Sequence, residues 1–159
     1  MTETIVRVAD WAVGRGGTIV TLGLGSCVAI VLHDRQAGVG GLAHVLLPSP
    51  TLARDRTNPA KFPETAVPLL VERLHELGGV HDRLRARLVG GAAMFANLAS
   101  TGMAQMGERN VMAARDALKT ARIPVVGEDT GSDYGRSVYF HLPGGRLEIR
   151  SVQRGTRDL

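Results

Sequence analysis

The chain has 159 residues, of which 44% are hydrophobic, a formal net charge of +4 and a single cysteine. This length suits one compact core without disulfides or metal, so we expect residues 1–159 to form a single domain. A lone cysteine forms no internal disulfide, the N-terminus lacks the features of a secretory signal, and no apolar run approaches the roughly 20 residues that span a bilayer. Composition therefore favours a cytoplasmic protein without membrane insertion.

The positive charge is carried almost entirely by arginine, whose planar guanidinium suits carboxylates and phosphates. An acidic partner would fit this charge, and so would a plainly solvated arginine-rich surface. Only three Phe, two Tyr and one Trp are present, too few for a base-stacking platform. We therefore expect no nucleic-acid partner.

The first half of the chain predicts strands joined by glycine-rich turns. Short strands are expected at 5–8 and 18–22, where β-branched residues alternate or cluster. The unbroken apolar run at 28–32 indicates a strand buried on both faces, and 39–47 is expected to return beside it. The polar stretch 49–63 is expected to be an exposed loop.

The second half adds helices to this pattern. Apolar residues at helical spacing predict amphipathic helices, strict alternation at 83–88 predicts a strand with an exposed face of three arginines, and two further runs flank a Pro-Gly-Gly turn as a hairpin. The expected helices are 64–77 and 107–121, the further strands are 123–127, 137–142 and 147–152, the stretch 92–99 is a short helix or a loop, and the tail from Gln153 is loosely held. This order predicts an α+β fold with a mostly antiparallel or mixed sheet.

The single cysteine, Cys27, follows a Gly-Leu-Gly-Ser sequence, and His44 lies on the expected return strand. A thiol becomes a nucleophile when a neighbouring base takes its proton, which an imidazole can do. With a turn at 34–37, paired residues have numbers that sum to 71 and Cys27 faces His44. With a turn at 35–38 they sum to 73 and Cys27 faces Leu46.

Both registers place Cys27 and His44 on one face of the sheet, because opposed residues and those offset by two point to the same side. A bulge at Gly40-Gly41 would reverse this. Thr21, on the preceding strand, can hold the far nitrogen of the ring, and Ser26 competes for this part although it points away from Cys27. A free cysteine is also often a packing residue, and that alternative stays open.

Other kinds of site are disfavoured. One cysteine with scattered histidines lacks the spacing of a zinc site, and no glycine cluster completes a dinucleotide or phosphate-binding motif. We therefore expect neither metal nor cofactor. The remaining histidines are expected to be solvated: His33 is assigned to the face opposite the thiol, while His75, His81 and His141 fall on polar or loop positions.

Five motifs follow one another along the chain: Leu24-Gly-Ser-Cys27-Val-Ala-Ile, Gly40-Gly-Leu-Ala-His44-Val-Leu-Leu-Pro48, Gly90-Gly-Ala-Ala-Met-Phe95, Gly107-Glu-Arg-Asn110, and Glu128-Asp-Thr-Gly131 with Gly135-Arg-Ser-Val-Tyr-Phe140. In order and spacing they resemble the CheD family of chemoreceptor glutamine deamidases. The resemblance covers nearly the whole chain.

This resemblance implies a cytoplasmic enzyme of chemotaxis that hydrolyses glutamine side chains of methyl-accepting chemoreceptors to glutamate, without metal or cofactor. It implies a layered α/β/β sandwich similar to the catalytic domain of cytotoxic necrotising factor deamidase toxins. The family's nucleophile, base and orienting hydroxyl fall on Cys27, His44 and Thr21. The implied reaction is acyl transfer through a thioester. In some members a CheC-type phosphatase also binds the deamidase.

Two positions depart from the family pattern: Ala43 stands where asparagine is frequent, and Gly131-Ser132 replaces a paired glycine. Two other functions stay open. The chain could be a non-catalytic adaptor for chemoreceptors and a CheC-type phosphatase, or a thiol enzyme acting on another amide or ester, such as a toxin-like deamidase of a different protein. The arginine row at 83, 85 and 87 could dock on an acidic receptor.

Overall fold

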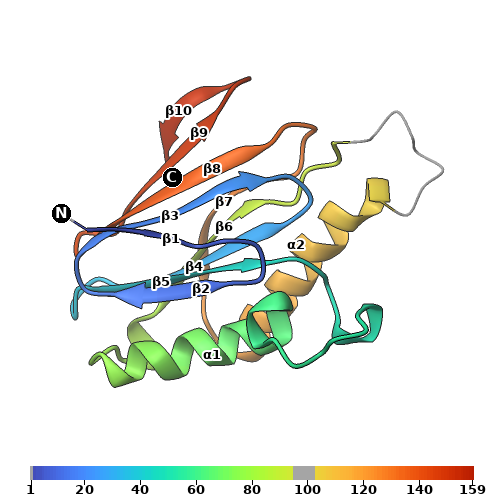
Figure 1. Ribbon diagram of the computed structural model, residues 1–159. Coiled ribbons are helices and arrows are strands. Elements are labelled where there is room, and N and C mark those ends of the chain that lie inside the picture. The colour runs from blue at the N-terminus through green and yellow to red at the C-terminus, as the bar shows by residue number, and fades with distance from the viewer. Residues whose placement is uncertain (1, 95–102) are drawn as a thin grey trace.

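The computed structural model describes residues 2–94 and 103–159 and shows three layers. Two five-stranded sheets pack face to face, and two helices cover the outer face of one of them (Figure 1). The first sheet has the strand order β1 (Glu3–Ile5), β3 (Gly17–Leu24), β8 (Arg136–Leu142), β9 (Arg146–Ser151), β10 (Gly155–Asp158). The second has the order β2 (Trp11–Gly14), β5 (Val39–Val45), β4 (Val28–Asp34), β6 (Arg85–Gly90), β7 (Val125–Thr130).

This architecture confirms the predicted α+β class and its layered α/β/β arrangement with mixed sheets. Strands β1 and β3 pair in parallel, as do β6 and β7, while the remaining neighbours in both sheets are antiparallel. The expected likeness to the toxin deamidases stays a prediction.

Strand β4 is the centre of the molecule, and all seven of its residues are buried. Its even-numbered side chains, such as Ile30 and Leu32, pack with α1 (Pro63–Glu76) and α2 (Met103–Thr120). Its odd-numbered side chains, such as Ala29 and Val31, pack against the first sheet. A strand covered on both faces needs an unbroken apolar run, which explains the sequence of this segment.

The two helices form near the predicted positions. Helix α1 begins at Pro63, ends before Gly78, whose φ of +95° suits a residue without a side chain, and buries Leu70 and Leu74. Helix α2 buries Val111, Ala114 and Leu118 on one stripe, as expected from their spacing. Short 3-10 turns occur at 50–52, 59–61 and 81–83. Within the described residues, no helix is both long and apolar enough to cross a membrane.

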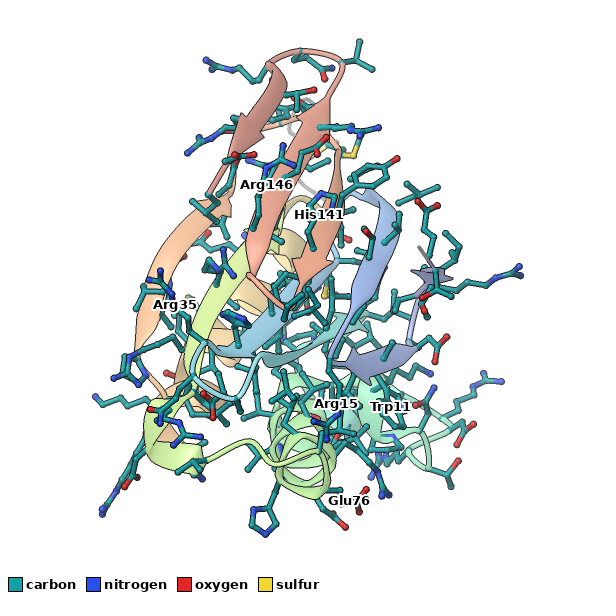
Figure 2. All side chains as sticks on the ribbon, turned by 90° about the vertical axis from the view of Figure 1, so that its left-hand side faces the viewer. Trp11, Arg15, Arg35, Glu76, His141 and Arg146 are labelled. Atoms are coloured by element: carbon teal, nitrogen blue, oxygen red, sulfur yellow. The ribbon has the colours of Figure 1, made fainter. Side chains whose placement is uncertain are left out.

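Strand β2 was not expected, because its apolar run of three residues leads directly into the glycine-rich stretch 14–17, which predicts a turn. It pairs with β5, where Gly41 leaves room for it, because a Cβ there would lie 2.7 Å from the side chain of Val13. Both ends of β2 are held against the α1 region. At its start, the guanidinium of Arg73 lies over the ring of Trp11, and just after its end Arg15 donates to the carbonyl of Leu77 over 2.6 Å. Figure 2 shows Trp11 and Arg15 on the side of the molecule where α1 lies.

The predicted row of three exposed arginines is wrong. Strand β6 begins only at Arg85, because Arg83 lies in the preceding 3-10 turn and pairs with the fully buried Asp34. Arg87 is half-buried over the ring of Phe140 and donates to the carbonyl of Gly145 over 2.7 Å. Of the three, only Arg85 is exposed.

Other boundaries also differ from expectation. The first strand is Glu3–Ile5 rather than 5–8, and β7 begins two residues later than predicted. The tail from Gln153 is not loose, since Gly155–Asp158 pairs with β9 and Asp158 forms an ion pair with Arg146. The stretch predicted as a short helix or loop at 92–99 lies partly outside the described residues.

Candidate active site

The hairpin of β4 and β5 takes the second of the two predicted registers. Ala29 lies opposite His44, so paired residues have numbers that sum to 73. The pairing continues without a shift through Gly40 and Gly41, so the bulge that would have reversed the faces is absent from this hairpin. Cys27 directly precedes β4 and packs with Ala29 between the two sheets. The thiol and the imidazole therefore belong to the same face, on diagonal positions.

The ring of His44 is held from the opposite sheet by Thr21 of β3. The Thr21 Oγ1 atom lies 2.7 Å from His44 Nδ1 and also 2.7 Å from the carbonyl oxygen of Val6. A carbonyl only accepts, so the single hydroxyl proton goes to Val6, and Nδ1 must donate its own proton to Thr21. The hydrogen-bond network thus assigns the neutral tautomer that leaves Nε2 with a free lone pair.

Burial decides the charge of both groups. His44 is fully buried, and its Nε2 has no hydrogen-bond partner among the described residues. Burial lowers the pKa of His44 to about 4, so the imidazole is neutral near pH 7. Burial also raises the pKa of the Cys27 thiol, an effect that the residue's own backbone N–H partly offsets. The pair is therefore a neutral thiol and a neutral base rather than a preformed ion pair.

A short N-terminal segment fixes the backbone of His44. The N–H of Ala9 donates to the His44 carbonyl over 2.8 Å, and the His44 N–H donates to the Asp10 carbonyl over 3.0 Å. Ala9 has a positive φ of 61°, and its carbonyl accepts a 2.8 Å hydrogen bond from the side chain of Asn58. This segment, together with Val6, orients both the ring and the main chain of the base.

Three successive carbonyls of the loop before β4 each accept a hydrogen bond. Ala92 N–H donates to Gly25 over 2.8 Å, Asn110 Nδ2 to Ser26 over 2.9 Å, and Gly91 N–H to Cys27 over 2.8 Å. We call residues 25–27, which end at the predicted nucleophile Cys27, the nucleophile loop. With its carbonyls fixed on the α2 side, the loop has a single defined path into β4.

Glycines permit this close packing. Gly90 has a φ of +114°, and a Cβ there would collide with the Cys27 carbonyl. A Cβ at Gly107 of α2 would lie 2.5 Å from the carbonyl oxygen of Gly91. The paired glycines at 90–91 and the glycine of α2 thus allow the helix, the β6 end and the nucleophile loop to meet.

Comparisons with known proteins give the family. A family model described as CheD chemotactic sensory transduction matches residues 46–151. The probable chemoreceptor glutamine deamidase CheD of Pyrococcus horikoshii is 45% identical over 156 residues, 98% of this chain and 96% of that protein. Its counterpart in Caldanaerobacter subterraneus is 41% identical over 160 residues, 99% of each. The chain belongs to the CheD family.

A third relative, the probable chemoreceptor glutamine deamidase CheD 3 of Geobacter sulfurreducens, is 47% identical over 151 residues, 94% of this chain and 93% of that protein. The CheD family model begins two residues after His44, so Thr21, Cys27 and His44 lie outside its range, while the whole-chain relatives span them. Among solved structures, the Bacillus licheniformis hypothetical protein YfiH aligns with a TM-score of 0.48 at 12% identity, over 78% of this chain and 51% of that one.

Of the two candidates to hold the ring of His44, Thr21 contacts it. The expectation that the other four histidines are solvated is wrong for two of them. His33 shares the face of Cys27, is only 9% exposed, and donates from Nε2 to the Pro143 carbonyl over 2.9 Å at the far end of β4. His141 is half-buried beside Thr18 and Glu148, near Arg146 on the β8–β9 hairpin (Figure 2).

A groove of about 550 Å³ opens beside the nucleophile loop. Its walls come from the ends of β3, β8 and β9, including Gly23, Ser137 and Arg150, and from Met94. The sulfur of Met94 would lie 2.9 Å from a Cβ at Gly25, so this side chain covers the loop from the groove side. Within 2–94 and 103–159, no three side chains of His, Cys, Asp or Glu gather as a metal site would require.

Proposed function

We propose that this chain is a cysteine-dependent protein-glutamine deamidase of chemotaxis, which converts glutamine side chains of methyl-accepting chemoreceptors to glutamate in the cytoplasm. Membership of the CheD family supports this, because the curated relatives are themselves named probable chemoreceptor glutamine deamidases. The proposed catalytic residues are Cys27, His44 and Thr21.

One observation carries the proposal. A fully buried histidine has one ring nitrogen hydrogen-bonded to a hydroxyl and the other without a partner in the part of the chain that the structure describes, on the same face as the chain's only cysteine. A histidine that served packing alone would leave a buried acceptor unsatisfied at a cost of about 1–3 kcal/mol. A base that takes a proton from a thiol needs that lone pair free.

The proposed reaction has two halves. In the first, His44 Nε2 takes the Cys27 proton while Sγ attacks the glutamine δ-carbonyl, and an oxyanion forms. The oxyanion collapses to a thioester as the C–N bond breaks, and His44 returns its proton to the departing ammonia. In the second, His44 takes a proton from water, the hydroxide attacks the thioester, and the thiol leaves with glutamate as product. Thr21 keeps the imidazole in the required tautomer throughout.

The developing oxyanion needs a hydrogen-bond donor near the thiol. The backbone N–H of Cys27 fits this part, because it already lies close enough to the sulfur to lower its pKa. The three carbonyls of the nucleophile loop are bonded toward β6 and α2. The groove beside the loop is then the proposed approach for the substrate side chain, with exposed Leu22, Met94 and Val152 around it as apolar contacts for a receptor helix.

The test is amide-to-acid conversion on chemoreceptor cytoplasmic fragments, read by peptide mass spectrometry. Wild-type protein should convert selected glutamines, and Cys27→Ala and His44→Ala should not. Wild-type protein that binds a receptor but converts no glutamine would favour the adaptor instead. Conversion only on proteins other than receptors would favour the toxin-like alternative, and a CheC-type phosphatase as a further partner stays a prediction for a separate binding measurement.

A further inference from the structure

Between residues 105 and 120 of α2, Asn110 is the one polar side chain on the buried stripe, where Val111, Ala114 and Leu118 are its apolar neighbours. It is fully buried. Its Nδ2 atom donates two hydrogen bonds, one to the carbonyl of Ser26 over 2.9 Å and one to the carbonyl of Leu46 over 3.1 Å. One amide therefore joins the residue before Cys27 to a residue just after His44.

These two carbonyls lie where the β4–β5 ladder stops. The last pair of the hairpin is Val28 with Val45. In a continued ladder, Cys27 would pair with Leu46, but the Leu46 N–H donates instead to the Lys61 carbonyl over 2.9 Å. The strands part at this point, one step before the thiol. The Asn110 amide spans the parting, so it takes over from the ladder in setting the separation of the two chains.

The bridge has a cost in buried polarity. Asn110 Oδ1 is buried and has no hydrogen-bond partner among the described residues. Such groups are rare, and each one calls for a reason. The two hydrogen bonds to carbonyls offset part of the cost of the unpaired Asn110 Oδ1. An apolar residue at this position, with the two carbonyls bonded elsewhere, would leave no unpaired polar atom. The remaining reason for a buried amide here is the position of the two carbonyls, one beside the proposed nucleophile and one beside the proposed base.

We propose that Asn110 is a positioning residue that holds Cys27 at the working distance from His44 by binding both flanking carbonyls. This inference rests on the proposed function for its meaning in catalysis. It concerns the geometry of thiol and base, however, and can be measured without any receptor, because Cys27 is the only cysteine of the chain.

Asn110→Asp is the informative substitution, since it keeps the shape but replaces the amide that donates to both carbonyls. Asn110→Leu removes the donors without adding charge and serves if the aspartate variant does not fold. Leu118→Ala is the matched control, because Leu118 lies on the same buried stripe and makes none of the three hydrogen bonds to the carbonyls of the nucleophile loop. It lowers stability through a cavity and leaves the bridge in place.

The first measurement is the rate of Cys27 alkylation by iodoacetamide near neutral pH, followed by intact mass, in a double-mutant cycle with His44→Ala. If Asn110 acts through the thiol–imidazole geometry, Asn110→Asp lowers the rate on the order of tenfold when His44 is present and changes it little when His44 is absent. Equal effects in both backgrounds would mean that the residue only supports the fold, and the inference would be overturned.

The second measurement is receptor deamidation. Asn110→Asp should lower kcat on the order of 100-fold with KM nearly unchanged, whereas Leu118→Ala should retain kcat despite a lower melting temperature. Full activity of both Asn110 variants would also overturn the inference. A wild-type protein that shows the expected alkylation cycle but deamidates no receptor would leave the inference standing and remove the proposed substrate.

Discussion

The hydroxyl of Thr21 accepts the Nδ1 proton of His44 over 2.7 Å, although the two residues belong to different sheets. The same hydroxyl donates to the Val6 carbonyl, so its one proton is already committed. This chain of two hydrogen bonds selects one tautomer of the imidazole. It leaves Nε2 as the acceptor on the face of Cys27, which is the form that a general base requires.

Replacing Thr21 tests this chain directly. Thr21→Val keeps the shape of the side chain but removes the hydroxyl, so both tautomers become accessible and deamidation should fall by about 10- to 100-fold. Thr21→Ser retains the hydroxyl and should stay within a few-fold of wild type. Both losses should be smaller than those of Cys27→Ala or His44→Ala, because Thr21 orients and does not itself exchange protons with the substrate. The measurement is the steady-state deamidation rate of each variant on one receptor fragment. Equal rates for Thr21→Val and Thr21→Ser would contradict the role of Thr21 in selecting the tautomer.

The pH dependence of the reaction should follow the buried imidazole. Because burial lowers the pKa of His44 to about 4, the base is already unprotonated throughout the neutral range. Deamidation should therefore be level on the acid side of neutrality and decline only as the pH approaches this value. The measurement is kcat/KM against pH. An acid midpoint near the ordinary histidine pKa of about 6.5 would show that the ring is solvated in the working enzyme.

The same group links folding stability to pH. The unfolded chain protonates His44 near a pKa of about 6.5, whereas the folded chain does so only near 4. Between these values the unfolded state binds more protons, so the free energy of unfolding contributed by His44 is complete above the upper value and decreases as the pH falls toward the lower one. The expected loss is on the order of 3 kcal/mol.

Denaturant unfolding at a series of pH values measures this loss, and His44→Gln provides the control. The glutamine variant should show a shallower decrease over the same interval, since it has no imidazole to protonate. Parallel curves for the two proteins would assign the pH dependence to other groups.

Gly107→Ala tests how the nucleophile loop is held. A Cβ at this position would lie 2.5 Å from the Gly91 carbonyl oxygen and also press on Ala92. The overpacking costs about 1–3 kcal/mol and is opposed by a helix-propensity gain of about 1 kcal/mol. The displaced N–H groups of Gly91 and Ala92 are those that bind the Cys27 and Gly25 carbonyls. Gly107→Ala should therefore lose much of its deamidation activity while its melting temperature changes only slightly.

Gly16→Ala is the matched control, since a Cβ there meets no atom within 4 Å. This variant should keep both activity and stability. A Gly107→Ala protein that loses stability and activity in proportion would argue against a specific effect on the nucleophile loop.

Much of the fold could be predicted from the sequence where a pattern repeats over several residues. The β4–β5 hairpin followed from two apolar runs and a polar turn, which left two registers open, and the helices followed from their apolar spacing. Strands β2 and β10 could not be predicted for different reasons: the three apolar residues of β2 run directly into glycines, and β10 has no apolar face. Trp11–Gly14 depends on the space that Gly41 of β5 leaves for Val13, and Gly155–Asp158, exposed along its whole length, depends on its pairing with β9.

The site was predictable only in its side chains. Cys27 and His44 could be placed on one face by counting residues, and the same count should have put His33 on that face as well. Thr21 was predicted only as a hydroxyl on the preceding strand, and it reaches His44 from the opposite sheet. The carbonyl of Val6 and the N–H groups of Gly91 and Ala92 carry no residue-specific signal, so no sequence pattern points to them. Asn110 did leave a signal, since a single amide interrupts an otherwise apolar helix stripe.

The proposed catalytic residues are divided between the two sheets, so activity should depend on how closely the two sheets pack. Cys27 and His44 belong to one sheet, and Thr21, whose hydroxyl orients the His44 ring, belongs to the other. Slight swelling between the layers would break the Thr21–His44 contact while every strand kept its own ladder. Catalysis should then disappear under mild pressure or denaturant before any secondary structure is lost. A partly expanded molecule would therefore be inactive rather than active on the wrong glutamines.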